Sequence, residues 1–292
     1  MPFAFTARND TADQVRRIAL EQVEKALRDA REVDGGVDAT VHRVRRRAKR
    51  VRGLLRLVKP SFEAYARENA VVRDAGRKLS GRRDAIVVQE TFEGLLIAGH
   101  LVLAEDGLSA VRVSLLDNAG TTEAGADVLG DFAGLFAALS ERIPEWRING
   151  RGFGVINDGL EANYRRFRRA MARARSSGRA EDLHEWRKAA KYHWHHVTLL
   201  ERAAPEVLGA NLKTLDDLGE RLGDHHNLHV LAERIEASEL PPAVKEAAQA
   251  AIGKRQNDLA KAAFALGSQL AAERPEALRD RFAAYWKLLR ED

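Results

Sequence analysis

The chain has 292 residues, with 48 lysines and arginines against 43 aspartates and glutamates and no cysteine. A chain of this length can bury a substantial core, as one large domain or two ordinary ones, without disulfides. The most apolar stretch, 85–104, is interrupted by glutamine, glutamate and histidine, so it predicts a core helix and not a membrane span. The N-terminus has too few apolar residues for a signal peptide. We therefore expect a cytoplasmic protein with no membrane partner.

Four helices are expected in the first part of the chain. The first begins at residue 11 or 13 and runs to about 31, and a turn at 34–36 leads into a basic helix that stops before Pro60. Two more are expected over 61–79 and about 83–103. Short turns between such helices are typical of an antiparallel bundle.

The basic helix, HRVRRRAKRVRGLLR, carries two neighbouring stripes. One is apolar with alternating spacings of three and four residues: Val41, Val44, Ala48, Val51, Leu55 and Val58. The other is cationic: His42, Arg45, Lys49, Arg52 and Arg56. No acidic residue lies between Asp38 and Glu63, and four like-charge pairs at i,i+4 oppose the helix by about 1–2 kcal/mol together. A helix with this local concentration of positive charge indicates a polyanionic ligand, although the net charge of +5 is modest.

The remaining chain is also mostly helical in pattern. The region 105–152 is less regular, with one helix expected over 124–142 and a connection over 144–154. Later helices are expected over these ranges: 157–175, 183–200, 241 or 242 to about 270, and 275 to about 290. The fold class is therefore all-α.

The double stripe of the basic helix occurs a second time. The second apolar stripe contains Leu183, Trp186, Ala190, Val197 and Leu200, interrupted by His193, and its cationic neighbours are His184, Arg187 and Lys191. The spacing H-x2-R-x3-K is the same in both places, and a second matched pair of blocks follows at 79–84 and 222–227. This pattern predicts an internal duplication into halves 1–150 and 151–292.

These segments resemble the CHAD domain, the conserved histidine α-helical domain. The resemblance is carried by VHRVRRRAKRVRGLL, LSGRRD, YRRFRRA, LHEWRKAAKYHW and LDDLGERLGDHHNL. It spans nearly the whole chain, so a stand-alone CHAD protein is expected, without the catalytic tunnel domain that accompanies CHAD in some proteins. The resemblance implies two pseudo-symmetric four-helix bundles with a basic groove between them. It also implies binding of inorganic polyphosphate and association with polyphosphate granules, and enzymes of polyphosphate metabolism are further candidate partners.

The resemblance also assigns the binding residues. They are His42, Arg45, Arg46, Lys49, Arg52 and Arg83 in the first half, and Tyr164, Arg165, Arg168, His184, Arg187, Lys188 and Lys191 in the second. The second half departs from the first at Trp194, which stands in the place of Arg52, and at His226, which stands in the place of Arg83. The second half is therefore expected to bind less tightly.

Several alternatives remain open from the residues alone. The cationic stripes could be solvated faces beside a core, and His42 and His184 could contact phosphate or be structural. His193 is expected in the core, and His225 with His229 has a spacing that could hold a metal, although no further metal motif accompanies it.

The chemical motifs that would indicate catalysis are missing from the sequence. No P-loop, serine nucleophile elbow or cluster of catalytic carboxylates is recognisable, and phosphohydrolysis usually needs a metal or an activated nucleophile. We therefore expect a protein that is not an enzyme and uses no metal or cofactor. One alternative is an enzyme acting on phosphate chains through His42 or His184. The other is a nucleic-acid-binding protein, which the absence of base-reading or stacking groups on the first stripe disfavours.

Overall fold

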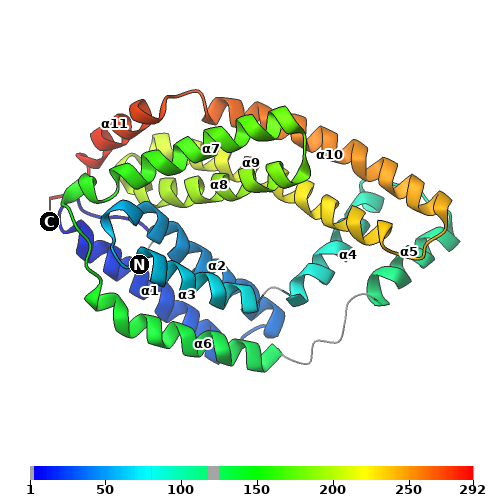
Figure 1. Ribbon diagram of the computed structural model, residues 1–292, viewed down its shortest axis with the longest axis horizontal. Coiled ribbons are helices and arrows are strands. Elements are labelled where there is room, and N and C mark those ends of the chain that lie inside the picture. Colours follow the sequence, from blue (N-terminus) through cyan, green and yellow to red (C-terminus); the bar gives the residue numbers. More distant parts are fainter. Residues whose placement is uncertain (1–2, 80, 118–124, 292) are drawn as a thin grey trace.

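The computed structural model describes residues 3–79, 81–117 and 125–291, and it is all-α in these ranges, with no β-strand (Figure 1). The helices of the first half are α1 (Thr11–Glu32), α2 (Val37–Leu57), α3 (Tyr65–Lys78), α4 (Gly81–Ile97), α5 (Glu105–Asp117) and α6 (Gly125–Arg142). Those of the second half are α7 (Asn157–Ser177), α8 (Ala180–Leu200), α9 (Pro205–Glu236), α10 (Pro242–Leu270) and α11 (Pro275–Trp286). The predicted fold class is confirmed.

Most helix boundaries lie close to the prediction, three differ, and α5 and α9 were not among the expected helices. The third helix begins at Tyr65 because Lys59–Ser61 forms a separate 3-10 turn around Pro60. The fourth ends at Ile97, where Gly99 adopts a φ of 66° and its N–H bonds back to Leu96 O, which closes the helix. The less regular region contains α5 in addition to the expected α6. The last helix ends at Trp286, and the chain beyond it pairs with the N-terminal segment through Arg8 N–H and Arg290 O at 2.9 Å.

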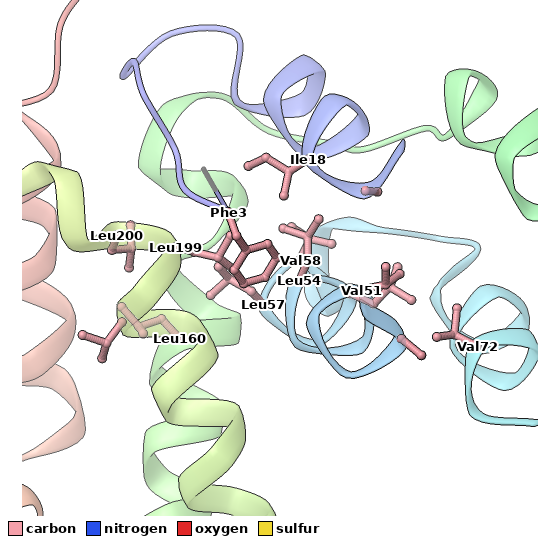
Figure 2. Packing of buried hydrophobic residues seen from close by; sticks show 14 of the residues in the cluster. Phe3, Ile18, Val51, Leu54, Leu57, Val58, Val72, Leu160, Leu199 and Leu200 are labelled. Carbon is pink, nitrogen blue, oxygen red and sulfur yellow. The ribbon is translucent and has the colours of Figure 1, made fainter. Parts of the chain in front are cut away.

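One large hydrophobic cluster joins the two halves of the chain. Side chains from α1, α2, α3 and α6 share it with side chains from α7 to α11. In Figure 2, Leu54 and Leu57 of α2, with Val58 just after it, lie near Leu160 of α7 and Leu199 of α8. The N-terminal segment closes this junction, because Phe3 and Phe5 are buried there and Phe5 N–H bonds to Leu199 O at 2.8 Å. Burial on this scale is the main stabilising contribution to the fold.

A second hydrophobic cluster lies at the far end of the molecule and also combines both halves. Phe92 and Leu95 of α4 and Val111 of α5 pack with Leu231 of α9 and Ile252 of α10. Figure 1 shows α4 and α5 beside the distal parts of α9 and α10. At this end the core is therefore shared between the halves. The two separate four-helix bundles and the boundary near residue 150 stay predictions.

Glycines with positive φ values form two of the turns between helices. The α1–α2 turn falls where the sequence placed it, with Gly35 and Gly36 at φ values of 71° and 88° that favour glycine. Gly178 ends α7 with a φ of 64°. Within the described residues, no helix has both the length and the apolar composition that crossing a membrane would require.

Candidate anion-binding surface

The cations of α2 divide into two sets by the element that they face. The apolar stripe is buried from Val44 to Val58. On one side of it, Arg43 and Arg47 lie 3.7 and 3.4 Å from the Asp29 carboxylate of α1. Arg50, on the same side, bonds to Gln22 of α1 at 3.4 Å. Asp38 is the only acidic residue of α2, but α1 provides a carboxylate for Arg43 and Arg47 and a neutral partner for Arg50.

The predicted stripe lies on the other side of α2, toward α3. Arg45 donates from Nη1 to Leu79 O, 2.8 Å away, at the C-terminal end of α3. This end carries partial negative charge, which an arginine stabilises. Arg52 Nε lies 3.5 Å from Asn69 Oδ1 of α3. Groups of α3 thus orient these two guanidinium groups, and Asp74 of the same helix also interacts electrostatically with Arg52.

The other members of the first stripe differ in exposure. His42 and Lys49 are exposed on α2, and so is Arg46, a predicted binding residue outside the stripe. Arg56, half-buried at the end of the stripe, lies over the ring of Tyr192 of α8, with 4.1 Å from Cζ to the ring centroid. The side chain of Arg83 lies outside the described residues, so its predicted place in the site stays a prediction.

On α8, the predicted stripe faces α9. The ring of His184 lies against His226 of α9, with 4.0 Å between the centroids. Burial and the nearby charges of Lys188 and Arg187 lower the pKa of His184. Lys191 Nζ lies 3.4 Å from Asp216 Oδ1. His184 is thus half-buried between the two helices, where burial and the neighbouring cations disfavour its protonated form.

Two glycines of α9 allow these α8 side chains to lie across it, and the sequence interpretation missed them. A Cβ at Gly219 would lie 2.7 Å from Lys191 Nζ and 2.8 Å from its Cε. A Cβ at Gly223 would lie 3.5 Å from Arg187 Nε. The only signal in the sequence is a pair of glycines four residues apart inside a helical pattern, where glycine costs stability and needs a packing reason.

The remaining predicted residues of the second half lie on the α7 side of α8. Lys188 Nζ pairs with Glu185 at 2.5 Å, and the same carboxylate lies 3.1 Å from Arg166 of α7. Arg165 pairs with Glu161 of its own helix and with Glu276 of α11 at 3.2 Å. The structure therefore pairs Lys188 and Arg165 with carboxylates, although the charge of Lys188 also acts on His184.

Tyr164 is a buried residue of α7, and Arg168, one turn further along, is half-buried. The hydroxyl of Tyr164 donates toward Leu270 O at 2.9 Å and Glu273 O at 3.1 Å. Burial raises the pKa of Tyr164. Its hydroxyl is thus engaged with the end of α10, which fits a role in holding α7 in place.

Helices α2 and α8 touch where α2 has a glycine. A Cβ at Gly53 would lie 2.8 Å from His195 Cβ and 2.9 Å from its Cγ. His196 donates from Nε2 to Gly53 O at 3.0 Å. Both histidines are buried, and burial is the main cause that lowers the pKa of each to about 3. The contact is therefore close, uncharged and hydrogen-bonded.

The two cationic stripes come together at this contact. After burial and His196, the positive charges of Arg50, Lys191 and Lys49 further lower the pKa of His195. Lys49 and Lys191 hold the same position of the repeated H-x2-R-x3-K spacing, so equivalent members of the two stripes act on one buried ring. One member of each stripe therefore lies close enough to His195 to act on it electrostatically.

The other histidines do not add a recognisable metal centre. His193 is buried, as predicted, and burial is the main cause that lowers its pKa to about 3. His229 Nε2 lies 3.5 Å from Glu233 Oε1. In the ranges that the structure describes, no three histidine, aspartate or glutamate side chains are grouped to hold a metal ion.

Comparisons with known proteins agree on the family and the fold. A family model described as CHAD domain matches residues 17–236. The structure of PptA from Streptomyces chartreusis is similar with a TM-score of 0.60 at 12% identity, covering 91% of this chain and 100% of that one. The CHAD domain from the plant Ricinus communis is similar with a TM-score of 0.58 at 20% identity, covering 99% and 95%. No curated protein matches the sequence.

Proposed function

The chain belongs to the CHAD domain family, and on this premise we propose that it binds inorganic polyphosphate without catalysing a reaction. The family is linked to polyphosphate binding in general. The observation that carries the proposal is that Lys49 of α2 and Lys191 of α8 both act electrostatically on His195, which supports a shared electropositive region of the two helices.

The chemistry of the stripes suits a phosphate chain. Arginine presents a planar fork to two phosphate oxygens, whereas lysine presents a point charge. Arg45 is oriented by Leu79 O and Arg52 lies near the Asn69 side chain, so donors of fixed direction alternate with the exposed Lys49. A repeating anion needs only such repeated charges, and it needs no base-reading groups.

The contact between α2 and α8 also supports the proposed internal duplication. Gly53 precedes His195 by the same 142 residues that separate His42 from His184. Two related units that pack about a two-fold axis touch at equivalent residues, and Gly53 with His195 is such a pair. We therefore propose two pseudo-symmetric halves whose cationic stripes flank this contact as one basic groove.

Binding to polyphosphate granules follows as part of the same proposal. A granule presents many phosphate chains, so a protein that binds chains non-catalytically would be retained there. Localisation of a fluorescent fusion in cells with and without polyphosphate tests this point, and a distribution that ignores polyphosphate would refute granule targeting.

The binding proposal is tested by competition among polyanions of matched total charge. We expect long polyphosphate to bind more tightly than duplex DNA or RNA at about 150 mM salt, and its affinity to fall steeply with salt. Tighter binding of DNA or RNA would favour the nucleic-acid alternative. Incubation with long polyphosphate should release no phosphate, and release that survives further purification would indicate an enzyme.

A further inference from the structure

The imidazoles of His184 and His226 lie against each other between α8 and α9. Their ring centroids are 4.0 Å apart, and the ring planes are inclined by 34°. Both side chains are half-buried, so each is still partly accessible to a ligand. His184 is also the first member of the cationic stripe of α8, before Arg187 and Lys191. The imidazole pair therefore adjoins the proposed polyphosphate site.

The second half has a titratable group where the first half has a permanent charge. His226 stands in the place of Arg83 in the matched blocks, and Trp194 stands in the place of Arg52. Arginine is always protonated in proteins, whereas imidazole changes its charge between about pH 5 and 8. The second half therefore has fewer permanent cations than the first, and part of its charge depends on the protonation of imidazoles.

The charges around the pair hold it in the neutral form while the stripe is empty. Burial is the main cause that lowers the pKa of His184. Lys188, Arg187 and His229 act in the same direction, whereas Glu185 of α8 opposes them. Further charged groups in this network are Glu181 of α8, Asp224 of α9, Arg166 of α7 and Arg255 of α10. Near pH 7 the neutral imidazole is thus favoured.

A polyanion on the stripe would reverse this balance. Negative charge nearby favours the protonated imidazole. A protonated ring donates from both nitrogens, whereas a neutral one donates from a single nitrogen, and its hydrogen bonds to phosphate oxygens are charge-assisted. Two positive rings at a centroid distance of 4.0 Å would repel each other. The pair should therefore take up one proton, and not two, when phosphate binds.

We propose that His184 and His226 form a proton-dependent part of the polyphosphate site, which adds a positive charge to the second half as the pH falls from about 7.5 to about 5.5. This inference rests on the proposed function and adds His226 to its binding residues. Near neutral pH the permanent cations of both stripes would hold the chain, and the imidazole pair would strengthen the hold of the second half in more acidic solution.

The test is calorimetry with long polyphosphate in buffers of different ionisation enthalpy, which reports the protons taken up on binding. Wild-type affinity should rise from about pH 7.5 to about pH 5.5, by up to about tenfold per pH unit for each proton taken up. His226→Arg supplies a permanent cation, so it should bind more tightly than the wild type at the higher pH and take up fewer protons. The exposed His100→Arg, outside both stripes, is the matched control and should behave as the wild type does.

His226→Gln is the second variant, because its side-chain amide does not titrate. It should bind nearly as the wild type does at the higher pH and lose part of the tightening at the lower pH. His42 of α2 can also titrate, but it is present in every variant, so the differences among them report the α8–α9 pair. Thermal melts at both pH values establish that the variants are folded.

Two results would overturn the inference while the proposed function stands. One is equal proton uptake by the wild type, His226→Arg and His226→Gln, and the other is wild-type binding of equal affinity at both pH values. Absence of polyphosphate binding by the wild type at either pH would instead refute the proposed function, and this inference with it.

Discussion

At the scale of single residues, three neutral histidines in the core make stability depend on pH. His193, His195 and His196 each have a pKa of about 3 in the folded protein, mainly through burial, against about 6.5 in an unfolded chain. Below pH 6.5 the unfolded chain binds protons that the folded protein does not. Stability is therefore fully present above pH 6.5 and is lost as the pH falls toward 3, by up to ~1.4 kcal/mol per pH unit for each histidine.

His196→Gln tests this linkage. The glutamine amide can still donate to Gly53 O but does not titrate. Between pH 5 and 6 the slope of the unfolding free energy against pH should therefore fall by the contribution of about one bound proton. Urea unfolding at several pH values measures the slope. The exposed His100→Gln is the control and should retain the wild-type slope. An unchanged slope in His196→Gln would contradict the linkage.

Gly53 allows the close contact between α2 and α8, and a substitution there can test this role. Gly53→Ala places a methyl group 2.8 Å from His195 Cβ, and such overpacking costs about 1–3 kcal/mol, more than the ~0.5–1 kcal/mol that alanine gains in a helix. We expect a lower urea midpoint. Gly209→Ala on α9 is the matched control, because nothing lies within 4 Å of its added Cβ, and it should stabilise the protein. A stabilised Gly53→Ala would refute the close contact of α2 and α8.

At the scale of elements, α2 and α8 should contribute unequally to binding. Reversing charge in α2 with Arg45→Glu and Lys49→Glu should weaken long-chain polyphosphate binding by about a hundredfold, because two charged contacts are worth about 3 kcal/mol or more. Arg187→Glu with Lys191→Glu in α8 should weaken it less, since Trp194 stands where α2 has Arg52.

Calorimetry measures the polyphosphate affinity of both double variants and of a control double variant. Lys254→Glu with Lys261→Glu changes two exposed lysines of α10 and gives the same change of net charge. This control should bind nearly as the wild type does. Equal losses in all three would mean that net charge alone determines affinity, and normal binding by either stripe variant would refute the shared surface.

At the scale of the whole molecule, the two stripes should act together on a long chain. A polymer that touches both gains the second contact at high effective concentration, whereas tripolyphosphate can occupy one stripe only. Affinity per chain should therefore rise steeply with chain length and then level off, as measured by calorimetry over a series of lengths. Tripolyphosphate binding as tightly as the long polymer would contradict a joint surface.

The all-α fold, most helix positions and the two cationic stripes could be predicted from the sequence, because apolar residues three and four apart define a helix face wherever it packs. The apolar stripe from Val44 to Val58 and the stripe from Leu183 to Leu200 are both buried, as this periodicity predicts. His193 was placed in the core by the same periodicity.

Tertiary structure decided which of the cations share a surface. Arg43 and Arg47 share the single carboxylate of Asp29 of α1, and Glu185, which also contacts Arg166 of α7, pairs with Lys188. The joint core of α4 with α9 and the action of both Lys49 and Lys191 on His195 were equally beyond the sequence. The physical reason is common to all four: a helix period specifies the face on which a side chain lies, whereas its partner comes from a helix distant in the chain, which only packing brings within a few ångströms.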